Sequence, residues 1–195
     1  MEPIILASGS PRRREFLSHM GLPFTVINAD IDESQVRESD PEKLTGELAR
    51  LKVEKAMNIT KDNPPPWICG ADTVVALDEE ILGKPANRDG AALMLKKLSG
   101  REHTVYTSIA LYCGKTGKID CRCSTCTVNF AVISDNEVNF YLDSNEWQGA
   151  AGAYRIQGLA GMYIRAITGE PSAVAGLPLH DFYVMLMDNG YHYGV

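Results

Sequence analysis

The sequence has 195 residues, of which 45% are hydrophobic and 23% are charged, so it can fill a substantial core. Its formal net charge of -6 at pH 7 argues against a general affinity for nucleic acid, because that affinity needs clustered cations that displace counterions from phosphates. No apolar run reaches the roughly 20 residues that span a bilayer, and no basic region precedes one, so we expect a cytoplasmic protein without a membrane or nucleic-acid partner.

The chain begins with a strand, a loop and a helix start. Residues 4–7 form a short apolar run of strand type. Ser10 can cap the helix that follows, and Pro11 suits its first position. Gly21 ends this helix, and residues 24–28 predict a second strand.

Three arginines at positions 12–14 occupy the first turn of the predicted helix, where the positive end of the helix dipole disfavours cations. An anion would remove this conflict, because the free N–H groups of residues 8–10, the dipole and a guanidinium together suit a phosphate. A solvated basic turn is the alternative. The candidate substrate-binding residues of this segment are Ser8, Ser10, Arg12 and Arg13.

Residues 30–33 place three carboxylates after the second strand, where they could hold Mg²⁺ through hard oxygen ligands or could simply be solvated. A longer helix then begins after Asp40, with Pro41 at its first position, and prolines at 64–66 break the chain after it. Lys52 lies at the edge of the apolar stripe of this helix, so its side chain could merely extend along the surface into water.

Residues 67–77 predict a buried strand, and Asp72 falls inside it. Burying a charge without partners is costly, so Asp72 needs a metal, a cation or a catalytic task. A structural salt bridge would also satisfy it. Next, a stiff turn at Pro85 presents Lys84, which is well placed to reach phosphate.

The second half of the chain continues the mixture of helix and strand signals. Residues 87–98 predict a helix, residues 103–133 a long hairpin, and Ser134 with Glu137 the capping box of a short helix. Further expected elements are a strand at 162–167 and a final helix that begins near Leu179 and stops near Gly190. We infer one mixed α/β domain, and a cleft between two lobes is compatible with this pattern.

Five cysteines are an odd number in a chain too long to need disulfides, which favours a reducing compartment. Cys121, Cys123 and Cys126 could suggest a zinc site. They lie in an alternating segment of strand type, however, in which Cys126 faces opposite to the other two, and a fourth ligand is lacking nearby. We therefore favour ordinary strand thiols.

Eight short motifs in a fixed order cover almost the whole chain, at residues 6–13, 32–33, 48–52, 70–73, 83–85, 98–107, 152–158 and 176–179. Each is short, but eight in register argue against coincidence. Together they closely resemble the Maf family of nucleoside triphosphate pyrophosphatases. The resemblance implies a Maf- or inosine-triphosphatase-like fold, in which residues 1–195 form a single mixed-sheet domain flanked by helices.

Within that family, Ala-Asp-Thr at 71–73 and Ile-Gln-Gly at 156–158 resemble the branch that acts on dTTP and UTP, rather than a branch that prefers methylated guanine nucleotides. The resemblance implies that Asp72 is the proton acceptor. Arg12, Thr73 and Gln157 fall at positions that influence substrate choice, and CTP or modified pyrimidine nucleotides stay open as substrates.

The chain departs from the family pattern at two positions. Ala150 stands where many relatives have a lysine, and Arg155 replaces a common glycine.

An amide offers both a donor and an acceptor, so Gln157 could match a uracil or thymine edge in a pocket that excludes water. It could instead be a buried glutamine that bonds the backbone near Gly158.

Our mechanistic hypothesis places a divalent cation, Mg²⁺ with Mn²⁺ or Co²⁺ as alternatives, on Glu33 and Asp72, where it binds the triphosphate and activates water. Asp72 then removes a proton and hydroxide attacks the α-phosphorus, while Arg13, Lys52 and Lys84 stabilise charge on the phosphates. Two alternatives stay open: a sugar-nucleotide transferase, which needs a second substrate, and a non-enzymatic, nucleotide-sensing regulator of cell division. A homodimer is also open.

Overall fold

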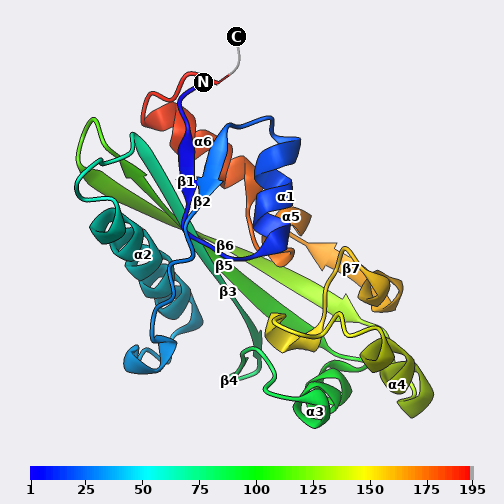
Figure 1. Ribbon diagram of the computed structural model, residues 1–195. Coiled ribbons are helices and arrows are strands. Elements are labelled where there is room, and N and C mark those ends of the chain that lie inside the picture. The colour runs from blue at the N-terminus through cyan, green and yellow to red at the C-terminus, as the bar shows by residue number, and fades with distance from the viewer. Residues whose placement is uncertain (194–195) are drawn as a thin grey trace. The chain divides into compact units, whose positions relative to one another are not determined.

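The computed structural model describes residues 1–193, apart from the side chain of Ser34. The strands within these residues are β1 (Ile4–Leu6), β2 (Phe24–Val26), β3 (Trp67–Leu77), β4 (Glu80–Leu82), β5 (Glu102–Cys113), β6 (Lys118–Phe130) and β7 (Ile164–Thr168). They form one sheet in the order β2-β1-β3-β5-β6-β7, with β4 beside β3 (Figure 1). The strand β1 is parallel to β2 and β3, whereas β4 and β7 are antiparallel to their partners. The predicted mixed sheet is therefore confirmed.

Helices flank this sheet, as the sequence predicts. The α-helices are α1 (Pro11–His19), α2 (Pro41–Ile59), α3 (Arg88–Leu98), α4 (Asp135–Asp143), α5 (Pro171–Val174) and α6 (Leu179–Asp188). Short 3₁₀ turns are η1 (Glu33–Gln35), η2 (Ala151–Ala153) and η3 (Leu159–Tyr163). In the part of the chain that the structure describes, none of the helices has the length and apolar character that a membrane crossing requires.

Local sequence signals account for the starts of the helices. The Asp40 carboxylate accepts hydrogen bonds from the backbone N–H groups of Glu42 and Lys43, at 2.9 and 3.1 Å, and so caps α2. Ser134 and Glu137 form the predicted capping box of α4. At α1 the expectation is only half met, since Ser10 is the N-cap residue but its side chain makes no capping hydrogen bond.

The chain divides into two compact units, each with its own apolar core. The first unit comprises Met1–Asp72, Thr107–Ser124 and the segment from Gly176 onwards, and the second comprises Thr73–Tyr106 and Thr125–Ala175. In the first unit, α1 and α6 pack on one face of the strands and α2 packs on the other (Figure 1). Alternation along β3 divides its side chains between these faces, so that Cys69 contacts the first cluster and Ile68 the second.

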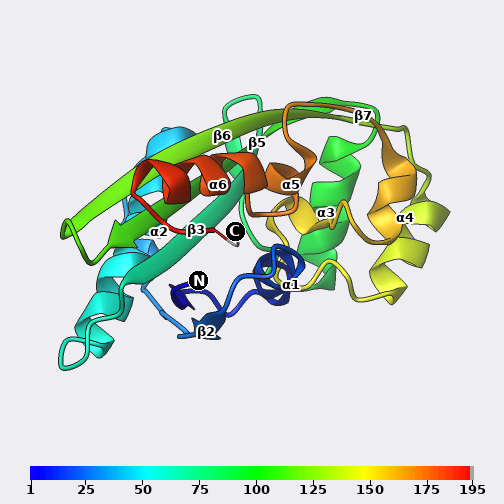
Figure 2. The same cartoon turned by 90° about the horizontal axis from the view of Figure 1, so that it is seen from above.

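The second unit is built around aromatic side chains. Phe130 packs edge-on against Tyr154, with ring centroids 5.4 Å apart, and its ring also lies 6.2 Å from that of Tyr163. Leu95 and Leu98 of α3 pack into this core. Figure 2 shows α3 and α4, which contact each other, at the right of the view.

Candidate active site

A buried ion pair joins α2 to β3 in the first unit. Asp72 is only 5% exposed and Lys52 only 9% exposed, and Lys52 Nζ lies 2.5 Å from Asp72 Oδ1. Lys52 is therefore the partner that a buried Asp72 requires, and the pair is also what the alternative of a structural salt bridge predicts. The alternative in which Lys52 extends along the surface into water is wrong, because the helix turns this side chain toward the strand.

Glu33 brings a second carboxylate to the same ammonium. It lies in η1, and its Oε1 is 3.4 Å from Lys52 Nζ. The Glu33 side chain is 44% exposed, so it faces solvent where Asp72 does not. One cation therefore sits between a buried and an exposed carboxylate.

Arg13 is a second cation fixed within this unit. Its Nε donates to the carbonyl oxygen of Gly176 at 2.7 Å, and its Nη1 donates to Ser8 Oγ at 3.1 Å. Burial lowers the pKa of the Arg13 guanidinium, while the charges of Asp72 and Glu33 act in the opposite direction. An arginine stays protonated at any ordinary pH, so the site keeps this positive charge.

The start of α1 differs in part from the predicted anion site, because the backbone N–H of Ser10, expected to be free, donates to Ser8 Oγ. Ser10 is the N-cap residue of α1, and its side chain makes no capping hydrogen bond. Ser8 is buried and its Oγ accepts a hydrogen bond from Ser10 N at 3.3 Å, so the loop before the helix is held by its own hydroxyl. Arg12 is half-buried in the same turn.

The remaining predicted residues belong to the second unit. Thr73 follows Asp72 on β3 and is half-buried, and Lys84 is exposed in the turn after β4. Gln157 is exposed in the segment between η2 and η3. The structure therefore shows neither a buried amide nor an amide inside a pocket that excludes water, and the role of Gln157 stays a prediction. The nearby Glu146 carboxylate accepts a hydrogen bond from Leu159 N at 2.9 Å and so holds the end of this segment.

The departures from the family pattern also lie in this segment. The Arg155 guanidinium donates to the carbonyl oxygen of Gln148 at 2.7 Å, and its backbone N–H donates to the Tyr141 hydroxyl at 3.1 Å. Ala150 is fully buried. The Arg155 side chain therefore links residues 148 and 155 by a hydrogen bond, whereas Ala150 is packed in the core.

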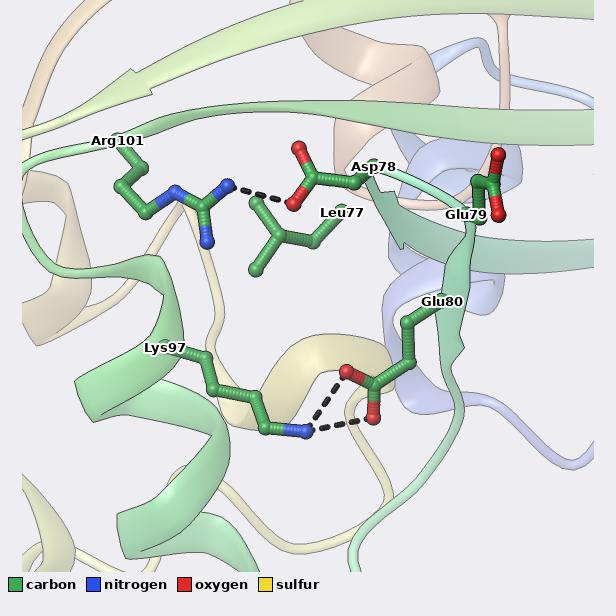
Figure 3. Close-up of a pocket in the computed structure, with 6 residues that line it drawn as sticks. All are labelled: Leu77, Asp78, Glu79, Glu80, Lys97 and Arg101. Atoms are coloured by element: carbon green, nitrogen blue, oxygen red, sulfur yellow. Dashed lines mark hydrogen bonds and ion pairs between the residues drawn. The ribbon is translucent and has the colours of Figure 1, made fainter.

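A separate pocket of about 520 Å³ lies in the second unit (Figure 3). It is lined by Leu77, Asp78, Glu79, Glu80, Lys97 and Arg101. Arg101 Nη2 is 2.7 Å from Asp78 Oδ2, and Lys97 Nζ is 2.6 Å from Glu80 Oε1. Its cations are thus neutralised by its own carboxylates, and it contains none of the predicted site residues.

The donor set near Lys52 fits a hard cation. Among residues 1–193, no group of three or more His, Cys, Asp or Glu side chains is arranged to hold a metal ion. Glu33 and Asp72 both contact the Lys52 ammonium, at 3.4 and 2.5 Å, so the cation between them in this structure is Lys52. Mg²⁺ is commonly held by only one or two carboxylates together with substrate phosphates, so two carboxylates suffice.

One feature of the site has no local sequence signal. The carbonyl of Gly176 anchors Arg13 across 163 residues of chain, which a short motif cannot reveal.

A buried thiol, Cys69, lies near Arg13, and burial raises its pKa to about 12. Because the thiolate is the reactive form, Cys69 is not a nucleophile at neutral pH.

Comparison with known proteins agrees with the order of the motifs. The family model described as Maf-like protein matches residues 3–189. A dTTP/UTP pyrophosphatase of Symbiobacterium thermophilum is 41% identical over 191 residues, covering 98% of this chain and 96% of the relative. One from Chelativorans sp. strain BNC1 is 42% identical over 192 residues, covering 96% of this chain and 91% of the relative. The solved structure of the Staphylococcus aureus Ham1 protein aligns with 67% of this chain and 72% of its own, at 15% identity and a TM-score of 0.47.

Proposed function

The chain belongs to the family of Maf-like proteins, and from this premise we propose that it is a nucleoside triphosphate pyrophosphatase that hydrolyses dTTP and UTP to the monophosphate and pyrophosphate. The relatives that carry this activity in their names match almost the full length of the chain. Substrate choice among dTTP, UTP, CTP and modified pyrimidine nucleotides belongs to this proposal.

The observation that carries the proposal is the buried ion pair of Lys52 and Asp72 beside Glu33. The 2.5 Å contact with the Lys52 ammonium positions the Asp72 carboxylate before a substrate arrives. Asp72 takes a proton from water as the water oxygen bonds to the α-phosphorus. The bond between the α-phosphorus and its bridging oxygen breaks, and pyrophosphate leaves with the electron pair.

The cations stabilise charge on the phosphates. Arg13 is held by Ser8 and Gly176, so its guanidinium is already oriented before a substrate arrives. The start of α1 adds the positive end of the helix dipole. Lys52 pairs with the Asp72 carboxylate and also stabilises the negative charge on the departing pyrophosphate. We assign Lys84 to the phosphates as well.

A divalent cation belongs to this proposal, with Glu33 and Asp72 as its protein ligands. When bound it would make a coordinated water more acidic and neutralise phosphate charge. Mg²⁺ suits two carboxylates with substrate oxygens, and Mn²⁺ or Co²⁺ are the alternatives. Glu33 is exposed and can turn toward a metal, whereas Asp72 keeps its position on β3.

The test is a nucleotide panel with product identification. The purified chain is incubated with Mg²⁺ and dTTP, UTP, CTP, ATP or TDP, and the monophosphate and pyrophosphate are quantified. We expect pyrophosphate from dTTP and UTP without a sugar phosphate, none from TDP, and none after chelation of the metal. A requirement for a sugar phosphate would indicate a transferase, and binding without turnover under every metal would indicate a regulator.

A further inference from the structure

Gly70 lies on β3 two residues before Asp72, so the two residues face the same side of the strand. We propose that Gly70 is a positioning residue, whose missing side chain lets α2 approach β3 closely enough for Lys52 to reach Asp72. This inference rests on the proposed function, in which the Lys52–Asp72 pair performs the proton transfer and charge stabilisation.

The space in front of Gly70 is filled by the backbone of α2. A Cβ atom on Gly70 would lie 2.6 Å from the carbonyl oxygen of Ala49 and 2.9 Å from Val53 Cγ2. Real Cβ contacts essentially never fall below 3.0 Å. Since the nearest atom is a backbone oxygen, no side-chain rotation relieves the clash, and the helix itself would have to move.

The turn of α2 that contacts Gly70 is the turn that carries Lys52. Ala49 and Val53 stand four residues apart, which is about one helical turn, and Lys52 lies between them in sequence. Both flanking residues are fully buried against the sheet. A displacement of α2 at Gly70 would therefore shift Lys52, whose ammonium is only 2.5 Å from the Asp72 carboxylate.

Backbone conformation does not explain this glycine. Gly70 is absent from the glycines with positive φ, so residues with side chains can adopt its backbone angles. A glycine inside a strand weakens the strand and often marks a close approach of another backbone. The close approach of Ala49 accounts for Gly70 without any other requirement.

The experiment is a double-mutant cycle of Gly70→Ala and Lys52→Met, with kcat and KM measured for pyrophosphate release from dTTP. We expect Gly70→Ala alone to lower kcat at least about tenfold with KM changed less than about threefold, because Arg13 and α1 still hold the phosphates. In the Lys52→Met background the same change should cost less than about twofold.

The matched control is Gly46→Ala in the same helix. A Cβ atom at Gly46 would lie 4.0 Å from Ser108 Oγ, which is ordinary contact, and Gly46 has no positive φ. It should keep kcat within about twofold of wild type. If Gly70→Ala does not fold, Val53→Ile replaces it, because the extra methyl group enlarges the side chain of α2 that faces Gly70. The same kcat and KM criteria then apply.

Thermal unfolding of the four variants of the cycle gives a readout that does not depend on activity. Lys52→Met should lower Tm by several degrees in the wild-type background, because it leaves Asp72 buried without its partner, and by less than half as much in the Gly70→Ala background. Wild-type kcat for Gly70→Ala, or equal losses of kcat and Tm in both backgrounds, would overturn the role of Gly70. A wild-type protein that releases no pyrophosphate would instead refute the proposed function, and the Tm cycle would still decide the positioning role.

Discussion

At the scale of single residues, the two carboxylates around Lys52 are not equivalent. Asp72 is 5% exposed and held at 2.5 Å, whereas the Glu33 side chain is 44% exposed and lies at 3.4 Å. A buried carboxylate that is held in place suits a base that accepts a proton from one defined water. An exposed carboxylate can move from a contact with a lysine to a contact with a metal ion. We therefore propose Asp72, also a metal ligand, as the base, and Glu33 as a metal ligand alone.

The role of Asp72 is tested by Asp72→Asn, which keeps the shape of the side chain but removes its charge and its basicity. We expect kcat for dTTP to fall by roughly 10²–10⁴-fold, the usual contribution of a positioned acid or base, while affinity for a non-hydrolysable dTTP analogue changes little. Asp62→Asn, at an exposed position, is the control. An Asp72→Asn variant within twofold of wild-type kcat would remove Asp72 from the mechanism.

Gln157 is exposed rather than enclosed in the expected water-excluding pocket, so its base-reading role is a prediction that needs a direct test. If its amide reads the pyrimidine edge, Gln157→Ala should lower kcat/KM for dTTP and UTP more than for ATP or GTP, because the lost hydrogen bonds are specific to the pyrimidine. The measurement is kcat/KM across the four nucleotides, with the exposed Gln148 changed to alanine as the control. An equal loss for every nucleotide would show that Gln157 supports the loop rather than the base.

At the scale of elements, α2 and β3 follow from the sequence because their ends are set locally. Asp40 caps α2, and β3 occupies residues 67–77 as predicted. The three-residue strand β4 was not predicted, since it owes its structure to pairing with β3 rather than to its own pattern. The predicted strand at 162–167 is two residues early, because Met162 and Tyr163 end η3 and β7 begins at Ile164.

The candidate site shows the same division between local and distant signals. A charged residue inside an apolar strand identified Asp72 from the sequence alone, and the structure supplies its partner 20 residues earlier. The anchoring of Arg13 by Gly176 and the contact of Gly70 with Ala49 depend on tertiary packing. Periodicity along one segment contains no information about such contacts.

The N-terminal cap of α2 gives a prediction for this element. Asp40→Ala leaves the N–H groups of Glu42 and Lys43 without their acceptor and should lower the free energy of unfolding by about 1 kcal/mol. Urea denaturation measures this loss, and Asp40→Asn, which retains an oxygen acceptor, should recover most of it. An unchanged unfolding midpoint in the alanine variant would show that the cap contributes nothing to stability.

At the scale of the whole molecule, the chain carries a net charge of -6, yet two of its cations, Arg13 and Lys52, are buried in the first unit. The second unit contains a different buried titratable group, His103, which is 3% exposed. Its Nε2 lies 2.8 Å from the Tyr154 hydroxyl, and its Nδ1 has no hydrogen-bond partner within the described residues. Burial lowers the pKa of His103 to about 4.

This histidine predicts a pH dependence of stability. The unfolded chain binds a proton at His103 below a pKa of about 6.5, whereas the folded chain binds it only below about 4. Stability is therefore lost as pH falls through this window, by up to about 3 kcal/mol from this residue. Denaturation at pH 7, 5.5 and 4.5 should show a smaller loss in His103→Gln than in wild type, and equal slopes would contradict the assignment.

The central claim is that a water activated within the first unit attacks the α-phosphorus of a pyrimidine triphosphate. Hydrolysis of dTTP in water enriched in oxygen-18, followed by mass spectrometry of both products, tests it most directly. We expect one labelled oxygen in the thymidine monophosphate and none in the pyrophosphate, because the bridging oxygen leaves with the β-phosphorus. Label in the pyrophosphate, or release of a diphosphate with labelled inorganic phosphate, would contradict it.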